Sequence, residues 1–452
     1  MTSPDVAALP AHGWRTFVWL WASQSLSVIL SGVSGFASSV YIAQTLYPRP
    51  DQQAQLSLGL TALFLISGLG AVLLAPHAGS WADRRDRRTT MIGADVLNGL
   101  ATLLLALAVL SGHGPLWLVL AVAALQILAE TYHGSALETS YAMLLPDARL
   151  GRANAMMQTS LQAARLFAPA VGSLVIALPV WLRGAGVLGG LHDGVGLVFV
   201  LDGLSFLLAA LVMARLAVPS PVQGEATASQ GVVHDTRLGW DYIRRRPPLL
   251  ALLVVLAFLN FSAAPMNLYE PLIANFNLAA SFRGLGLDFA SGLAVVSSAT
   301  ALGAFVGGLV ISGWGGLTTR RIRGVLWPVL VFAAMVGVVG FSRSLPLTAA
   351  ALFVFGLMFP AIGAHSGAIW MTLVPREIQG RVFSVRRLVS KFTIPLGTLV
   401  MGAVAARVAP GVVIGSVGLA FTALIALQFL NRGLWRVEDR AYLDGLAERA
   451  AR

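Results

Sequence analysis

The sequence contains no cysteine, and only 11% of its 452 residues are charged. The absence of cysteine excludes disulfide frameworks, thiolate metal sites and thiol catalysis. Soluble domains carry about 25% charged residues, so this chain cannot cover its apolar surface with a charged shell. The composition therefore argues against a water-soluble enzyme, and we predict no catalytic residues.

Two further motifs are missing. The sequence has no GxxxxGK[ST] loop, which would cradle a nucleotide phosphate, so we do not expect the chain to hydrolyse ATP. It also has no HExxH motif or comparable cluster of metal ligands. We therefore expect no metal site and no cofactor, and a proton gradient as the energy source.

Apolar runs dominate what is present. Hydrophobic residues make up 57% of the chain and its mean hydropathy is +0.77, which predicts an all-α polytopic membrane protein. The first run is too long for a cleavable signal peptide, so we expect it to remain as a helix. Hydropathy and helix breakers predict twelve transmembrane helices, at about 15–43, 56–78, 89–111, 115–140, 155–182, 195–217, 249–275, 286–312, 324–342, 346–373, 389–407 and 411–431.

The basic residues set the orientation of these spans. With the N-terminus inside, 25 of the 31 lysines and arginines fall in cytoplasmic segments, five fall outside, and Arg165 lies within a span. This distribution follows the positive-inside rule. It predicts a multi-pass protein of the cytoplasmic (inner) membrane with both termini in the cytoplasm, and it explains the +11 charge without a nucleic-acid partner.

A weak internal repeat indicates two related halves. Pro146 precedes Gly151 after the fourth span, and Pro375 precedes Gly380 at the same spacing after the tenth. Parallel six-helix halves are a recurrent transporter design. We predict two pseudo-symmetric six-helix bundles, divided as follows: 1–217 N-terminal bundle, 218–248 cytoplasmic linker, 249–431 C-terminal bundle, 432–452 cytoplasmic tail helix.

The loop after the second span carries a recognisable motif. Its sequence, from Gly79 through Asp83 to Arg88, resembles the GxxxDRxxRR signature of the major facilitator superfamily. The resemblance implies an inner gate that closes the cytoplasmic side, and we expect Glu138 to form a salt bridge with Arg87 or Arg88. The predicted gate residues are Gly79, Asp83, Arg84, Arg87, Arg88 and Glu138.

Other segments narrow the resemblance. Ala168, Pro169 and Gly172 in the fifth span are similar to the GxxxGPxxGG element of antiporters in that superfamily. Residues 151–155, 201–206 and 380–384 resemble the branch that contains macrolide-efflux and enterobactin-exporter proteins. The resemblance implies the major facilitator fold and drug:proton antiport.

Spans 1, 4, 7 and 10 carry polar or aromatic stripes at helical spacing. The resemblance implies that these helices line a central cavity, although small polar residues also mediate helix packing. His365 points away from the stripe of span 10, so we expect a satisfied interior histidine. The predicted substrate-binding residues are Gln24, Ser27, Ser31, Ser34, Gln126, Asn260, Asn267, Glu270, Phe359, Ser366 and Trp370.

Ionisable groups inside the membrane are functional candidates because they are costly there. Glu130 and Arg165 lie at similar depth on neighbouring spans, which predicts an ion pair between them. His133 lies one turn from Glu130, and Asp202 is a second carboxylate. We predict that Glu130, Arg165, His133 and Asp202 couple transport to protons.

Two functions fit these patterns. The first is proton-coupled export of a bulky amphipathic small molecule, such as a drug, macrolide or siderophore, by alternating access. The second is a lipid or lysophospholipid flippase, favoured if Arg165 is not paired with Glu130. In either case we expect a monomer whose partners are substrate, protons and membrane lipid.

Overall fold

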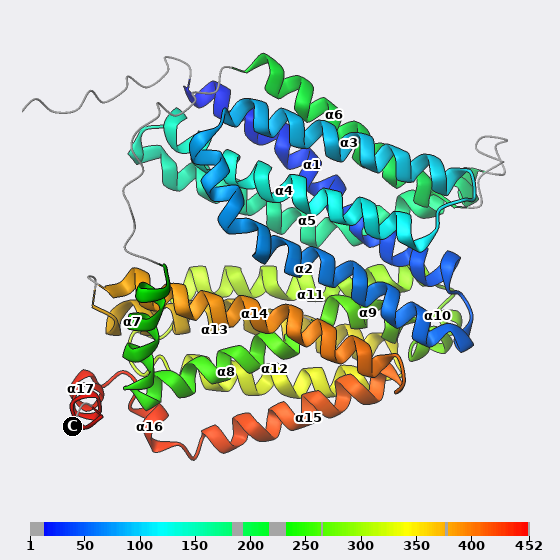
Figure 1. Ribbon diagram of the computed structural model, residues 1–452. Coiled ribbons are helices and arrows are strands. Elements are labelled where there is room, and N and C mark those ends of the chain that lie inside the picture. Colours follow the sequence, from blue (N-terminus) through cyan, green and yellow to red (C-terminus); the bar gives the residue numbers. More distant parts are fainter. Residues whose placement is uncertain (1–12, 183–192, 217–231, 264, 376–377, 451–452) are drawn as a thin grey trace, which may run out of the picture. The chain divides into compact units, whose positions relative to one another are not determined.

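A computed structural model describes residues 13–182, 193–216, 232–263, 265–375 and 378–450 (Figure 1). Side chains are described at all of these positions except 76, 79–80, 82–84, 139, 141–142, 147–148, 151, 232–236 and 391. Within these ranges every regular element is a helix. Twelve helical segments of the described chain are long and apolar enough to cross a membrane, which confirms the predicted number of spans.

The contacts divide the chain into two compact units, and we call residues 1–46 with 65–225 unit 1. Within it, α1 packs against α5 and α6, while α3 packs against α4 and α6. The helices of unit 1 are α1 (Gly13–Tyr41), the π-helical turn η1 (Ile42–Leu46), the later part of α2 (Gln53–Arg84), α3 (Arg87–Leu110), α4 (Leu116–Leu144), α5 (Asp147–Leu182) and α6 (Val195–Arg215).

The α3–α6 contact shows why small residues matter in this unit. A Cβ placed on Gly99 would lie 3.0 Å from the carbonyl oxygen of Gly203, and a Cβ on Gly203 would lie 3.0 Å from that of Gly99. The two backbones can approach this closely only because both residues lack a side chain. This approach brings neighbouring positions of α3 and α6, Asp95 and Asp202 among them, into the interior of unit 1.

Unit 2 comprises residues 47–64 and 226–452. Its helices are the 3-10 turn η2 (Pro50–Gln52), the first part of α2, α7 (Val232–Arg244), α8 (Pro247–Ala263), α9 (Met266–Phe276), α10 (Ala279–Gly284), α11 (Phe289–Trp314), α12 (Arg323–Phe341), α13 (Leu345–Leu373), α14 (Gln379–Ala405), α15 (Pro410–Gln428), α16 (Arg432–Trp435) and α17 (Arg440–Arg449).

The start of α2 belongs to unit 2 by its contacts, although the sequence placed it in the first bundle. The Gln53 side-chain amide donates to the carbonyl oxygens of Ala405 at 2.8 Å and Val408 at 3.0 Å. A Cβ on Gly402 would meet the Thr61 hydroxyl. One continuous helix thus contributes residues to both units.

Span 7 is divided into two helices rather than one. α8 ends at Ala263 and α9 begins at Met266, directly after Pro265. Proline has no N–H to donate and restricts the residue before it, so it favours a helix start at this point. The division leaves Glu270 in the second turn of the short helix α9.

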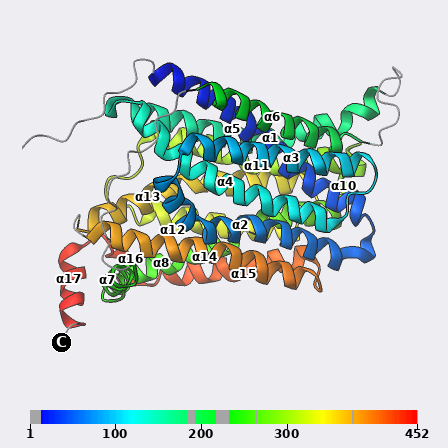
Figure 2. The same cartoon turned by 45° about the horizontal axis from the view of Figure 1, so that its top comes forward.

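The predicted linker contains a helix, and the predicted tail helix is divided in two. Residues 217–231 of the linker lie outside the described chain, and its later part forms α7. The single predicted tail helix is two short helices, because Asn431 caps α16 and Asp439 caps α17 through their side-chain oxygens. Figures 1 and 2 both place α7, α16 and α17 at the same end of unit 2.

Candidate functional site

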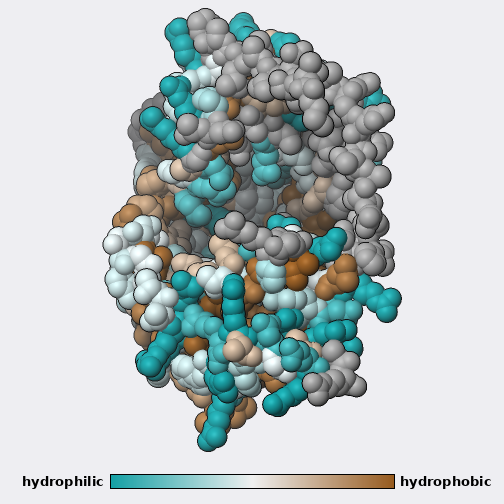
Figure 3. All heavy atoms as spheres, turned by 90° about the vertical axis from the view of Figure 1, so that its left-hand side faces the viewer, coloured by the Kyte–Doolittle hydropathy of each residue, from teal (hydrophilic) through white to brown (hydrophobic). Residues whose placement is uncertain are grey.

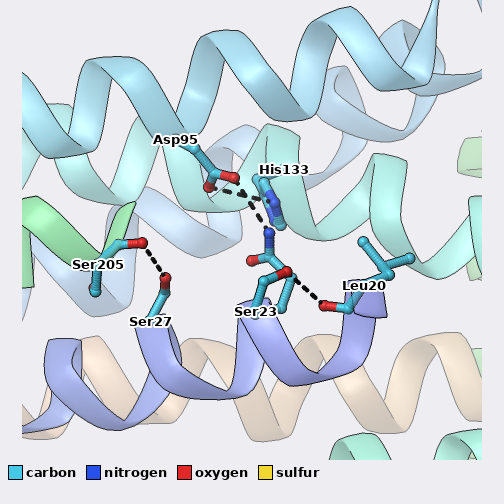
Figure 4. Close-up of polar contacts among 7 residues, drawn as sticks. Leu20, Ser23, Ser27, Asp95, His133 and Ser205 are labelled. Carbon is cyan, nitrogen blue, oxygen red and sulfur yellow. Dashed lines mark hydrogen bonds and ion pairs between the residues drawn. The ribbon is translucent and has the colours of Figure 1, made fainter. Parts of the chain in front are cut away.

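Asp95 is the centre of a buried polar cluster in unit 1. This residue of α3 is 1% exposed and contacts side chains from two other helices (Figure 4). The Gln24 amide on α1 donates to Asp95 Oδ2 at 3.2 Å, and His133 Nε2 on α4 lies 3.4 Å from Asp95 Oδ1. We call Gln24, Asp95 and His133 the Asp95 cluster.

The contact between Asp95 and His133 depends on a proton. Its length of 3.4 Å exceeds that of an ordinary hydrogen bond, and it becomes an ion pair only when the imidazole is protonated. His133 is itself only 8% exposed. One proton therefore decides whether this buried pair carries a net negative charge or none.

Sequence reasoning missed Asp95, although the signal was present. Asp95 is a carboxylate within the apolar run of the third span, and an ionisable residue in such a run is a functional candidate. The predicted candidates Gln24 and His133 are both its contacts. A residue predicted for substrate binding and one predicted for proton coupling thus contact the same carboxylate, Asp95.

Asp202 on α6 forms a second buried carboxylate site in unit 1. It is fully buried, and the Ser31 hydroxyl donates to its Oδ1 at 3.1 Å. The Ser27 hydroxyl donates to the Ser205 carbonyl at 3.2 Å, and Ser34 is buried as well. The polar stripe of span 1 therefore joins α1 to α3 and α6 inside unit 1. These contacts favour the second interpretation of the span 1 stripe, in which small polar residues mediate helix packing.

Gln126 also bridges two helices of unit 1. Its side-chain amide on α4 donates to the Thr102 hydroxyl on α3 at 2.9 Å. Thr102 is fully buried and Gln126 is half-buried. This bond, like the contacts of Gln24, pairs a predicted substrate-binding side chain with a neighbouring helix.

The predicted pair of Glu130 and Arg165 is wrong. Among the described residues no ion pair joins them, and both side chains are exposed. Similar depth along two helices does not determine which way each side chain points around its axis, and here the pair does not meet. Glu130 remains one turn from His133 on α4.

The predicted inner gate is only partly described. Gly79, Asp83 and Arg84 lie in α2, and their side chains are outside the described set. Arg87 donates to the Met143 sulfur at 2.8 Å, and Arg88 donates to the carbonyl oxygens of Met213 and Ala214. Arg88 thus places a cation at the C-terminal end of α6, where the helix dipole favours one. Glu138 is exposed.

The antiporter-like element of α5 packs against α1. A Cβ on Gly172 would lie 2.7 Å from a ring carbon of Phe36, and one on Gly32 would lie 3.0 Å from the Cβ of Ala168. Pro169 is buried within α5. Small residues at these positions therefore allow close approach of the helix that carries Gln24.

Unit 2 holds one buried carboxylate among the predicted residues. Glu270 is 7% exposed and accepts hydrogen bonds from the hydroxyls of Ser297 at 2.6 Å and Thr300 at 3.2 Å, both on α11. Asn267 is exposed and Asn260 is half-buried. Of these three side chains, the two amides reach the surface of unit 2, whereas Glu270 is enclosed.

The predicted aromatic wall of span 10 is largely interior. Trp370 is fully buried with the Arg386 guanidinium 5.6 Å from its ring centre, so its ring does not reach an open surface in this structure, and its role in substrate binding stays a prediction. Phe359 is half-buried and packs edge-on against Phe332 and Phe355. Ser366 is buried and donates to the Gly363 carbonyl.

His365 is the satisfied interior histidine that the sequence predicted. It is 3% exposed, its Nε2 accepts a hydrogen bond from the Leu317 N–H at 2.8 Å, and its Nδ1 lies 2.7 Å from the Ala361 carbonyl. Both ring nitrogens therefore have partners when the ring is neutral with the proton on Nδ1.

Comparisons with known proteins agree with the helical architecture. Residues 20–398 match the family model of the Major Facilitator Superfamily. Macrolide efflux protein A of Streptococcus pyogenes is 23% identical over 411 residues, which is 88% of this chain and 91% of that protein. The protein of the same name from Enterococcus faecalis is 23% identical, covering 74% of this chain and 98% of its own length.

Solved transporters share the fold at low sequence identity. A bacterial homologue of the human lysosomal transporter Spinster, crystallised in an inward-facing and unoccupied conformation, has a TM-score of 0.60 at 17% identity over 98% of this chain and 96% of its own. The nucleoside transporter NupG has a TM-score of 0.61 at 15% identity, covering 92% of this chain and 98% of its own. These likenesses confirm the predicted fold class.

Proposed function

Since the chain belongs to the major facilitator superfamily, whose members are membrane transporters, we propose that it exports a bulky amphipathic small molecule of the macrolide class in exchange for protons. The substrate class is supported by the relatives named macrolide efflux protein A. The exchange for protons is supported by the buried Asp95 cluster. We further propose the cytoplasmic membrane as its location, with both termini inside.

The chemistry of the Asp95 cluster suits proton exchange. With Asp95 ionised and His133 neutral, the buried pair carries one negative charge, and Gln24 offers only a dipole in return. Holding such an uncompensated charge away from water is costly, whereas an ion pair within the cluster carries no net charge. Once protonated it is an internal ion pair with no net charge, and it releases the proton when water or a competing cation reaches it.

The Asp95 cluster lies between three helices, so its charge can affect how these helices pack. Gln24, Asp95 and His133 belong to α1, α3 and α4, so a change of charge at the pair alters attraction among three helices at once. Glu130 lies one turn from His133 on α4 and is exposed, and we propose it as the carboxylate that relays protons to the pair. The bound substrate would contact groups that reach the surface of their units, such as Asn267 and Phe359.

Transport by purified protein in proteoliposomes tests the proposal. An imposed pH gradient should drive accumulation of a macrolide in the wild type and fail to do so in Asp95→Asn, which should still exchange substrate without a gradient. Asp51→Asn is the matched control, because Asp51 is an exposed carboxylate paired with exposed Arg49. Unaltered gradient-driven accumulation in Asp95→Asn would contradict the proposed role of the cluster.

A second candidate function draws on one observation. Arg165 is exposed and is not paired with Glu130, which leaves a cation in the fifth span available to a phosphate headgroup. A flippase would use such a cation. Translocation of a fluorescent lysophospholipid in the same proteoliposomes, abolished by Arg165→Gln but not by Asp95→Asn, would favour this function over macrolide export.

A further inference from the structure

A cavity at one end of unit 2 is lined by residues from three segments far apart in the sequence. Its volume is about 650 Å³. The segments are the loop after α11, the end of α13 and the chain between α16 and α17. Figure 3 shows hydrophilic residues gathered at this end of unit 2. The lining residues are Thr318, Thr319, Arg320, Arg321, Met371, Thr372, Leu373, Val374, Pro375, Glu438 and Arg440.

The loop after α11 is held in a specific conformation. Gly315 and Gly316 have φ angles of 80° and 75°, and the Leu317 N–H that follows them donates to buried His365. Arg320 has a φ of 53°, a left-handed conformation that costs free energy for a residue with a side chain. The loop backbone therefore keeps this conformation at Arg320 despite its cost.

The tail forms the opposite wall of the cavity. Leu434 and Val437 are fully buried and anchor it to unit 2. Glu438 Oε1 accepts a hydrogen bond from the Arg321 N–H at 3.0 Å, which joins the tail to the loop. Asp439 caps α17, and the hydrogen bonds from Arg436 and the Tyr442 N–H hold its pKa below the ordinary carboxyl value.

Hydrogen-bond donors exceed acceptors around the cavity. Arg320 has no side-chain partner within the described chain, Arg321 reaches only the Thr372 hydroxyl at 3.5 Å, and Arg440 donates once, to the Thr372 carbonyl. Each guanidinium has five N–H donors, so most of them are free to bind a ligand. Glu438 is the one carboxylate among the described lining residues, and one of its oxygens is already occupied.

The C-terminal end of α13 does not cancel this positive charge. A helix C-terminus carries partial negative charge on its last carbonyls. Here the Thr372 carbonyl accepts from Arg440 and the Leu373 carbonyl accepts from the Tyr242 hydroxyl at 3.1 Å. With these acceptors occupied, the guanidinium groups of Arg320 and Arg321 keep most of their donors free, and Thr318 and Thr319 line the same cavity.

We propose that this cavity binds a phosphate ester, with Arg320 and Arg321 contacting the phosphate oxygens. Arginine presents paired N–H donors that match a phosphate group. The volume lies within the range of small-molecule sites, roughly 300–1,000 Å³, so it accommodates more than a bare phosphate. Met371, Val374 and Pro375 supply an apolar side for the organic part of the ester. The ester comes from a lipid headgroup or from a soluble metabolite.

Binding measurements on the purified full chain in detergent test this site, independently of any transport. The probes are glycerol 3-phosphate and short-chain phosphatidylglycerol, titrated by calorimetry. We expect the wild type to bind at least one probe and Arg320→Gln to bind it at least about tenfold more weakly. Arg343→Gln, which removes an exposed arginine outside the cavity lining, should bind like the wild type.

The pattern across probes identifies the source of the phosphate. Binding of both probes indicates recognition of the phosphate ester itself, and binding of phosphatidylglycerol alone indicates a lipid headgroup. Arg320→Gly relieves the left-handed backbone cost and removes the same side chain, so it serves if Arg320→Gln does not fold. No binding by the wild type, or equal binding by the wild type and the Arg320 variants, would overturn the proposal.

Discussion

The interiors of the two units are built differently. Unit 1 buries two carboxylates, Asp95 and Asp202, and joins its helices through polar side chains of α1. Both units also have close backbone contacts at glycine, at Gly99 and Gly203 in unit 1 and at Gly303 and Gly356 in unit 2, so the units differ in their buried carboxylates. A Cβ on Gly303 or Gly356 would lie 2.0 or 2.1 Å from a carbonyl oxygen of the facing helix.

The difference shows which unit can respond to a proton. Close backbone contacts change little with pH, because they involve no ionisable group. The pair of Asp95 and His133 gains or loses a full charge with one proton. In unit 2 the buried carboxylate Glu270 is bonded to two neutral hydroxyls, so a proton there would neutralise a lone carboxylate rather than form an ion pair. We therefore propose that proton exchange resides in the Asp95 cluster of unit 1, with Glu270 as the competing site in unit 2.

The largest expected effect is on the packing of unit 2. Gly303→Ala would place a Cβ against the backbone carbonyl of Phe353, which cannot move aside as a side chain could, so we expect a loss of about 3 kcal/mol in the free energy of unfolding. Gly308→Ala, also on α11, meets nothing within 4 Å and is the matched control. The midpoint of thermal unfolding in detergent is measured for both variants. Equal midpoints would show that the close contact at Gly303 does not stabilise the protein.

In unit 1 the corresponding perturbation is chemical rather than steric. Asp95→Ala leaves the Gln24 amide and His133 without their acceptor, which should cost about 2 kcal/mol of folding free energy. Asp95→Asn retains an oxygen for Gln24 and should cost less. Unfolding of both variants at one pH gives the comparison. An alanine variant as stable as the wild type would show that the cluster does not hold these helices together.

A smaller effect is expected at Glu270. The Glu270→Gln side chain still offers an oxygen to the hydroxyls of Ser297 or Thr300, so stability should change by less than about 1 kcal/mol. Transport driven by a pH gradient should persist in this variant, in contrast to Asp95→Asn. If gradient-driven transport is lost in Glu270→Gln instead, the proton carrier lies in unit 2 and the comparison between the units is reversed.

The smallest expected effect concerns Trp370. Its ring is fully buried and its Nε1 has no acceptor among the described residues, so Trp370→Phe should leave macrolide affinity within about twofold of the wild type. Equilibrium binding of a radiolabelled macrolide measures this, with Phe359→Ala as the half-buried comparison. A large loss of affinity confined to Trp370→Phe would support the sequence-based assignment of this residue to the binding cavity.

The sequence predicted the architecture because hydropathy and arginine placement act over whole spans. The twelve spans follow from such long patterns, whereas the superfamily was indicated by the short motif from Gly79 to Arg88. Even so, Pro265 divides the seventh span, and the caps at Asn431 and Asp439 divide the tail helix. These local features depend on single residues, which a window of average hydropathy does not resolve.

The site was harder to predict because it depends on the direction of each side chain. Depth along the span placed Glu130 and Arg165 together, but no ion pair joins the two side chains among the described residues. A polar stripe indicated that one face of span 1 is special, yet it could not say whether that face meets substrate or a neighbouring helix. Asp95 was within reach of the sequence, since it is an isolated carboxylate in an apolar run.

Proton release on substrate binding tests the central assignment most directly. Purified protein in weakly buffered detergent solution is mixed with a macrolide, and the change in pH is recorded with a dye. We predict that the wild type and Glu270→Gln release protons, while Asp95→Asn binds the macrolide without releasing any. Release by Asp95→Asn equal to that of the wild type would show that the exchanged proton resides elsewhere, and would contradict the account.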